Sequence, residues 1–223
     1  MRLDEALQHL DAISAAADRS NTYDGLRAFP TALTSLIALT AAAVQQRFVA
    51  YSADATTGYL TLWVFVAASA LVIVLADMTL RYYRDPTARA RRMTLEVLGR
   101  LSPAIAVGGA LTAIVFFTAR EIAWVLPGLW ASLLGLGIFA ASPLLPRSLQ
   151  QVAIWYVAAG LSVLILCQGS LALSPLAMAI PFGGGQMLAA WLMRKASQTK
   201  QPTSALDETS WLDDDEAHSG NVV

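Results

Sequence analysis

Charged residues are scarce in this chain. Asp, Glu, Lys and Arg make up 14% of its 223 residues, against about 25% in soluble proteins, while 56% are hydrophobic. Five windows contain no Asp, Glu, Lys, Arg or His: 28–46, 56–76, 101–119, 122–146 and 148–193. Because a helix needs roughly 20 apolar residues to cross a bilayer, the first four windows each predict one span and the last predicts two. A soluble bundle is disfavoured, since too few polar helix faces remain to cover it.

The residues that most often carry chemistry are also rare. The chain has one cysteine, Cys167, and two histidines, His9 and His218. A single cysteine excludes an intrachain disulfide, and histidines at the two ends leave no cluster to hold a metal. Ionisable residues inside a membrane usually mark a functional site, and the expected spans contain none. We therefore predict that the protein is not an enzyme and binds neither metal nor cofactor.

These patterns predict an all-α membrane protein, a bundle of six transmembrane helices. Gln168, Gly169 and Pro175 mark the turn that divides the longest window. The expected spans are about 28–47, 58–77, 100–119, 122–142, 149–168 and 174–193. A cytoplasmic amphipathic helix and linker (1–27) precede the transmembrane domain (28–194), and a disordered, acidic cytoplasmic tail (195–223) follows it.

The distribution of positive charge predicts the orientation. With the amino terminus inside, 13 of the 15 Lys and Arg residues fall in cytoplasmic segments, and only Arg47 and Arg120 fall outside. Because cytoplasmic loops carry an excess of Lys and Arg, we expect both termini in the cytoplasm. Six arginines between Arg81 and Arg100 fit this role and contact with anionic lipid headgroups, so no nucleic-acid partner is expected.

Two segments outside the spans are candidate contacts for a cytosolic protein. The stripe at helical spacing near the amino terminus consists of Leu3, Leu7, Leu10 and Ile13. A helix that lies on the bundle or the membrane surface is the favoured interpretation, and a docking or dimerisation helix is the alternative. In the tail, Trp211 and Leu212 stand among acidic residues, which is typical of an acidic disordered tail and also of a short recognition segment.

The stretch PFGGGQMLAAWLMRK, residues 181–195, has three consecutive glycines before a basic pair. A phosphate-binding loop is rejected, because the glycines lie about two turns from the cytoplasmic end and no Lys-Ser/Thr pair follows them. Close helix packing around a kink at Pro181 is the favoured interpretation. A solute pathway is the alternative, with Gln186 as its polar contact. The candidate residues are Pro181, Gly183, Gly184, Gly185 and Gln186.

Small residues four apart recur in other spans, as in Ala131 and Gly135, and in Gly109 and Ala113. Such pairs allow neighbouring helices to approach closely. The third and sixth spans also share a Ser-Pro start followed by glycines, at Ser102 and Ser174. Interrupted helices at matching positions of two inverted halves point to a transport site, although packing with a kink is the favoured interpretation here as well.

Three stretches give the chain a resemblance to a known family: LQHLDAISAAADRSNTY before the first span, PGLWASLLGLGIFAASPLLPR at 127–147, and the stretch at 181–195. They resemble a family of small bacterial membrane proteins with six helices and uncharacterised function, often encoded beside winged-helix regulators. The resemblance implies a six-helix fold in the bacterial cytoplasmic membrane. Members tend to show Gly-Phe-Gly-Gly-Leu-His where this chain has Pro181 to Gln186, so a proton or metal role at that position is not expected here.

Two hypotheses of function follow. The first is a non-enzymatic integral membrane protein that acts as a tether or sensor for a cytosolic regulator, through the segments near Leu3 and Trp211. The second is a small uncoupled permease for an apolar or weakly polar solute, with the kinked sixth span along its path. Expected partners are the lipid bilayer and a cytosolic protein, with a homo-oligomer as a further candidate.

Overall fold

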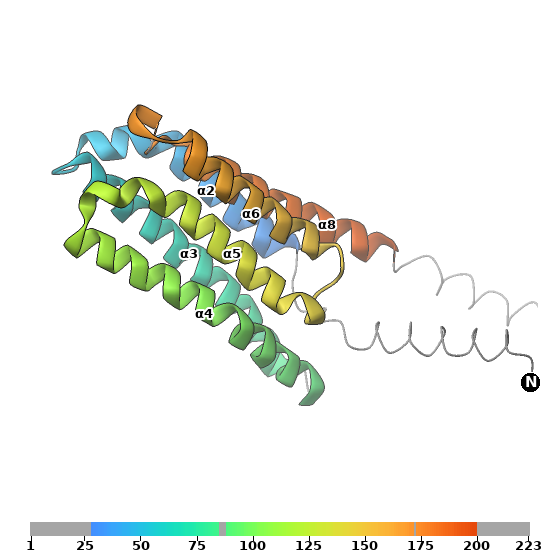
Figure 1. Ribbon diagram of the computed structural model, residues 1–223. Helices are drawn as coiled ribbons and strands as arrows, with labels where there is room; N and C mark the ends of the chain where they lie inside the picture. The colour runs from blue at the N-terminus through green and yellow to red at the C-terminus, as the bar shows by residue number, and fades with distance from the viewer. Residues whose placement is uncertain (1–27, 85–87, 172, 200–223) are drawn as a thin grey trace, which may run out of the picture.

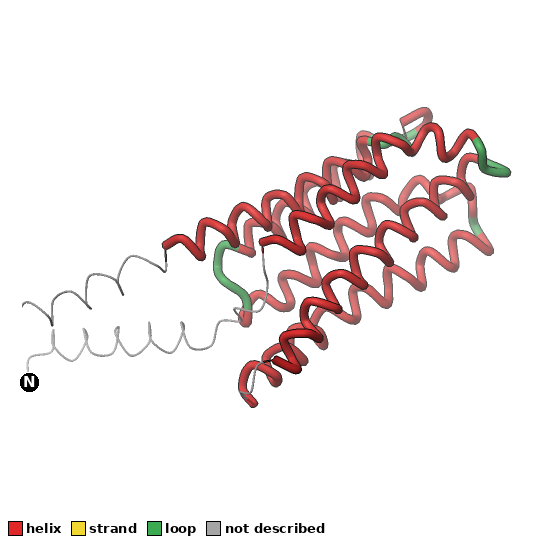
Figure 2. Tube along the Cα trace, turned by 180° about the vertical axis from the view of Figure 1, so that it is seen from behind, coloured by secondary structure: helices red, strands yellow, loops and turns green. Residues whose placement is uncertain are grey.

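A computed structural model describes residues 28–84, 88–171 and 173–199, and every regular element in these ranges is helical (Figures 1 and 2). The α-helices are α2 (Ala28–Ala50), α3 (Ala55–Arg84), α4 (Ala88–Thr118), α5 (Leu126–Ala141), α6 (Leu149–Leu166), α7 (Leu176–Met178) and α8 (Gly185–Thr199). The remaining elements are the 3₁₀ turns η1 (Arg120–Val125), η2 (Ser142–Leu144) and η3 (Gly169–Leu171), and the π-helical turn η4 (Ala179–Gly184).

Six helical segments are long and apolar enough to cross a membrane, and the last of them combines α7, η4 and the first turns of α8. The predicted all-helical class and the number of such segments are therefore confirmed. The predicted amphipathic helix lies outside the described residues, with its candidate contacts Leu3, Leu7, Leu10 and Ile13. The tail from residue 200, with Trp211 and Leu212, lies outside them too.

The helices follow one another around a closed ring. Each long helix packs on the next along the chain, and α8 with η4 returns to pack on α2. The contacts between α5 and α6 are the most extensive, and those between α3 and α4 are the sparsest. Figure 1 shows α4, α5 and α6 in front of α2 and α3. The first and last of the six long apolar segments are thus neighbours.

Several helices extend beyond the spans expected from the sequence. α3 continues to Arg84 and α4 begins at Ala88, so the described parts of the arginine-rich segment form helical turns that continue the apolar segments. Likewise α8 runs to Thr199, past the expected start of the tail at residue 195. Charged residues end the apolar window that defines a span, but Arg, Lys and Gln are good helix formers and let the helix go on.

Pro103 lies inside α4, where we expected a Ser-Pro start of the span. Proline has no backbone N–H, so the carbonyl of Gly99, four residues earlier, loses its helical partner. The Ser102 hydroxyl donates a hydrogen bond to that Gly99 carbonyl at 3.1 Å. This local bond lets the helix pass through the proline without a break.

The turn between α6 and α7 falls where Gln168, Gly169 and Pro175 predicted it. Gly169 has a φ of 59°, a left-handed conformation that glycine adopts at little cost. Pro175 is the N-cap of α7, where its missing N–H breaks no helical hydrogen bond. We call the end of the bundle that carries this turn, residues 51–54 and η1 the outer end, a label for its place in the bundle and not for a side of the membrane.

Candidate functional site

The buried face of α2 carries small or weakly polar residues instead of large hydrophobic ones. Its buried residues recur every three or four positions: Thr31, Thr34, Ser35, Ala38, Ala41, Ala42 and Gln45. Most of its exposed large residues are apolar (Phe29, Leu33, Leu36, Val44 and Phe48), while Gln46 and Arg47 are exposed near its last turn. Over most of its length the helix therefore turns hydroxyl and amide groups inward and large apolar side chains outward, the reverse of a surface helix in a soluble protein. We call the seven buried residues the α2 stripe.

The α2 stripe packs against the last of the six long apolar segments, whose helix is interrupted by η4. α2 contacts α7, η4 and α8 in turn. Within η4, Pro181 is almost fully buried and Gly183 is buried. A proline inside a helix removes one N–H donor, and the wider π-helical turn accommodates it. The backbone N–H of Gly185 donates to the carbonyls of Pro181 and Phe182, and neighbouring helices add side-chain bonds to the turn.

Side chains from two other helices supply partners for η4. The Ser35 hydroxyl of α2 donates to the carbonyl of Gly183 at 2.8 Å, and both groups are buried. From α6, the Trp155 indole Nε1 donates to the carbonyl of Pro181 at 3.3 Å. The interrupted turn is therefore held between α2 and α6 by one hydrogen bond on each side.

The three glycines at 183–185 allow close approach to these same helices. A Cβ atom at Gly183 would lie 2.5 Å from Leu39 Cδ2 on α2. On α6, a Cβ at Gly184 would lie 3.0 Å from Trp155 Cζ2, and one at Gly185 would lie 2.6 Å from Tyr156 Cζ. Consecutive positions thus face different neighbours, and no side chain fits at 183 or 185 unless a neighbour moves. Gln186, the next residue, is half-buried.

Gln45 forms the outer end of the α2 stripe and joins three elements. Its Nε2 donates to the carbonyl of Leu173 at 2.8 Å, and its Oε1 accepts from the indole Nε1 of Trp63 at 2.9 Å. Both Gln45 and Trp63 are buried, so this network contributes stability only because its members find partners. It fixes the outer end of α2 to α3 and to the turn before α7.

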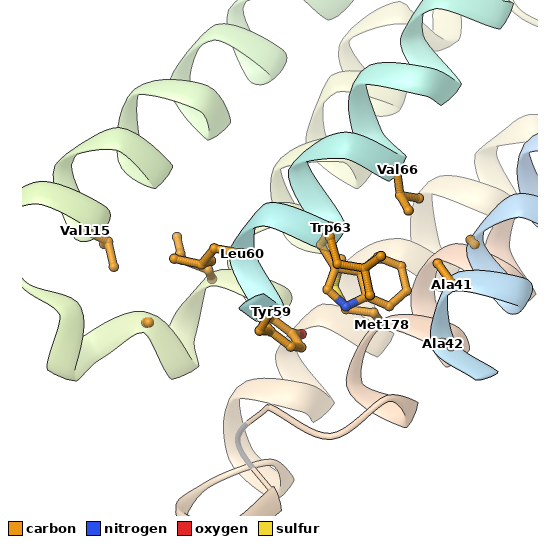
Figure 3. Close-up of a cluster of buried hydrophobic side chains, with 12 residues drawn as sticks. Ala41, Ala42, Tyr59, Leu60, Trp63, Val66, Val115 and Met178 are labelled. Carbon is orange, nitrogen blue, oxygen red and sulfur yellow. The ribbon is translucent and has the colours of Figure 1, made fainter. Parts of the chain in front are cut away.

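Trp63 fills the space between the outer end and η4. It is 1% exposed, and it belongs to a buried cluster with Ala41, Ala42 and Met178. Figure 3 shows its indole directed from α3 toward α2, beside Ala41 and Met178. Tyr59 lies one turn earlier on α3, with ring centroids 6.4 Å apart. The aromatic pair closes the interior at this level.

Two cavities open at the outer end, one on each side of the turn before α7. The first, about 570 Å³, lies between the ends of α2 and α3 and includes Gln45, Tyr59 and Ser174 in its lining. The second, about 530 Å³, includes Arg120 and Glu121. Leu173 lines both.

Charge in the described structure gathers at helix ends. Arg100 pairs with Glu96 at 2.9 Å near one end of the bundle, and Arg120 approaches Asp54 at 3.8 Å near the other. The hydroxyl and backbone N–H of Thr57 donate to the Asp54 carboxylate at 2.6 and 2.8 Å. These bonds, the hydroxyl bond first, hold the pKa of Asp54 below its usual value.

Among the described residues, no three His, Cys, Asp or Glu side chains lie close enough together to hold a metal ion. The arrangement instead offers hydroxyl, amide and indole groups that exchange hydrogen bonds. Such groups can bind or pass an uncharged molecule.

Sequence reasoning singled out Pro181, Gly183, Gly184, Gly185 and Gln186, and the structure places them opposite α2 and α6. It missed Ser35, Gln45 and Trp63. A signal for the first two was present, because polar and small residues recur every three or four positions through the first span. Comparison of the chain with protein-family models, curated proteins and solved structures gives no match.

Proposed function

We propose that the protein is a non-enzymatic, multi-pass protein of the bacterial cytoplasmic membrane that lets small uncharged solutes cross without ion coupling. The observation that carries the proposal is the α2 stripe, which faces an interrupted last span. The excess of Lys and Arg in the segments at the opposite end from Gly169 supports an orientation with both termini in the cytoplasm.

The chemistry of the α2 stripe favours uncharged solutes. Its side chains are hydroxyls, methyls and one amide, which exchange hydrogen bonds but cannot balance a charge. A bare ion would lose its hydration without compensation there. None of the seven residues can bind a proton or a cation as an ionised partner, which argues for passage without coupling.

The interrupted last span supplies the part that can move. Irregular backbone at membrane depth marks binding sites in many transporters, and single π-helical turns often mark functional positions. In this structure the interior is closed by Trp63 on the outer side and by the contacts of η4 further in. Opening requires α7 and η4 to shift against α2, which breaks the bond from Ser35 to Gly183.

A swelling assay tests the proposal. Proteoliposomes that contain the full chain are mixed with excess glycerol, and stopped-flow light scattering records how fast the vesicles re-swell. We expect faster re-swelling than in protein-free vesicles. Gly183→Leu, which places a side chain against Leu39 of α2, should reduce the protein-dependent rate at least tenfold.

Gly109→Leu is the matched control, because Gly109 lies on the exposed face of α4 with no atom within 4 Å of its Cβ position. It should leave the rate unchanged. No protein-dependent swelling with glycerol, urea or butyramide, or equal rates in the two variants, would refute the proposal.

The tether or sensor hypothesis predicts that function depends on the two ends of the chain and not on the core of the bundle. It rests on Leu3, Leu7, Leu10 and Ile13 and on Trp211 and Leu212, outside the described residues. Removal of residues 1–20, or of all residues after Lys195, should then abolish the cellular phenotype, and co-purification from cross-linked membranes should lose its soluble partner. Under the permease proposal both truncated chains keep their glycerol flux.

A further inference from the structure

The outer cavity beside α2 is large enough for a small organic molecule, and its lining is uncharged. Its volume is about 570 Å³. The described lining residues with polar side chains are Gln45, Gln46, Tyr59 and Ser174, and the others are apolar. This set combines apolar surface with two amides and two hydroxyls, and it contains no Asp, Glu, Lys, Arg or His.

Tyr59 lines this cavity and carries an unused hydrogen-bonding group that is enclosed behind the cavity wall. Its side chain is fully buried, and its hydroxyl oxygen has no hydrogen-bond partner among the described residues. Buried polar groups in proteins nearly always have partners, and the exceptions often reflect function. A phenylalanine would fill the same space without a buried hydroxyl.

Gln45 has hydrogen-bonding capacity left over. A primary amide offers two N–H donors and two acceptor lone pairs, and Gln45 uses one donor on Leu173 and one lone pair on Trp63. One donor and one acceptor position therefore remain on a side chain that lines the cavity.

The second outer cavity provides the contrast within the same molecule. Arg120 and Glu121 line it, so it presents both signs of charge. A charged molecule finds a counter-charge in the lining of that cavity and none among the described lining residues of the cavity beside α2.

We propose that the cavity beside α2 binds a small uncharged molecule that carries a hydrogen-bond donor and acceptor next to a short apolar body, with Tyr59 and Gln45 as its polar contacts. Its place at the head of the α2 stripe makes it the entrance of the path, and this part of the inference rests on the proposed function. Binding also brings the molecule to the amide that holds Trp63, the residue that closes the path.

Binding is tested directly with three probes of equal chain length: butyramide, butyrate and butylammonium. Saturation-transfer difference NMR is recorded on the full chain in detergent micelles, with protein-free micelles as the baseline. We expect a saturable signal for butyramide and signals at least fivefold weaker for the two ions. Tyr59→Phe and Gln45→Leu should each weaken butyramide binding at least fivefold.

Tyr51→Phe is the matched control, because Tyr51 is 93% exposed at the same end and does not line the cavity. It should bind butyramide like the unaltered chain. The midpoint of thermal unfolding, measured without probe, should be unchanged or higher in Tyr59→Phe, because the change removes a hydroxyl that has no partner. A lower midpoint would show that the hydroxyl serves the fold, and would overturn its assignment to a ligand.

Equal binding of the three probes, or full binding by Tyr59→Phe, would also overturn the inference. The binding assay and the flux assay test different proposals. Butyramide binding without glycerol flux leaves the cavity assignment standing and refutes the permease, whereas flux without binding does the reverse.

Discussion

The close contact between α5 and α6 leads to a sharp prediction for Gly160→Ala. Gly160 lies on α6 where α5 passes, and a Cβ there would be 2.7 Å from the carbonyl oxygen of Gly128 and 2.8 Å from the backbone nitrogen of Ser132. It would also meet the Ser132 hydroxyl. Because the obstacles are backbone atoms of α5, no side-chain rotation relieves them, and the two helices must separate.

The expected loss follows from two opposing effects. Overpacking of a close contact costs about 1–3 kcal/mol, and the upper end, about 3 kcal/mol, applies where backbone atoms block the new methyl group. Alanine in place of glycine within a helix returns about 1 kcal/mol. The net loss in the free energy of unfolding for Gly160→Ala is therefore about 2 kcal/mol.

Gly109→Ala isolates the second effect, because its Cβ position is open. It should raise the free energy of unfolding by about 0.5–1 kcal/mol. Both variants are unfolded reversibly from mixed micelles with increasing SDS, and circular dichroism at the helix band follows the transition. If Gly160→Ala were as stable as the unaltered chain, or if both variants lost stability equally, the α5–α6 contact would not be as close as described.

Three further predictions concern separate parts of the chain. Ser35→Ala should lower the free energy of unfolding by about 1 kcal/mol, because the buried carbonyl of Gly183 loses its side-chain partner, while Ser162→Ala, on an exposed face, should change it little. Asp54 has a folded-state pKa below its usual value of 3.8, so its contribution to stability is present above that pH and is lost as the pH falls through the lowered pKa. Asp54→Asn should remove this part of the acid sensitivity, measured as the SDS midpoint between pH 5 and pH 2. Cys167, the only cysteine, should react in spheroplasts with a maleimide that cannot cross membranes, and exclusive labelling after lysis would refute the proposed orientation.

The six helices could be predicted because charge is absent from long windows, and a bilayer span has a known length. The ends of the helices could not be predicted in the same way. α3 and α4 continue through the arginine-rich segment, since a helix depends on backbone hydrogen bonds and not on hydrophobicity. Hydropathy marks where a chain enters the membrane, and it does not mark where the helix stops.

Which side of each helix faces the interior of the bundle was harder to predict than the presence of the helix. In water, burial of apolar side chains selects the inward face, but lipid is as apolar as a leucine side chain and selects nothing. The inward turn of Ser35 and Gln45 therefore depends on partners distant in sequence, the carbonyls of Gly183 and Leu173. The sequence contains these hydrogen-bonding groups, but it does not show which of them pair.

The spacing of small residues four apart predicted close helix packing, but it did not identify which helix would be the neighbour. Ala131 and Gly135 are buried against α6, as such a pair allows. Gly109, in a pair of the same kind, lies on an exposed face. The same pattern thus occurs with and without a neighbouring helix, because spacing fixes which residues share a face and not what that face meets.

The contact between α2 and α8 also sets the order in which the proposed membrane bundle can be completed. In a membrane protein of this kind, a ribosome that delivers spans one at a time places α2 in the bilayer before α8. Until then, Ser35 lacks the carbonyl that it bonds, and the weakly polar face of α2 meets lipid or a helper protein. The nascent chain is therefore most vulnerable in its middle stages, when an insertase or membrane protease can distinguish an unfinished bundle from a closed one.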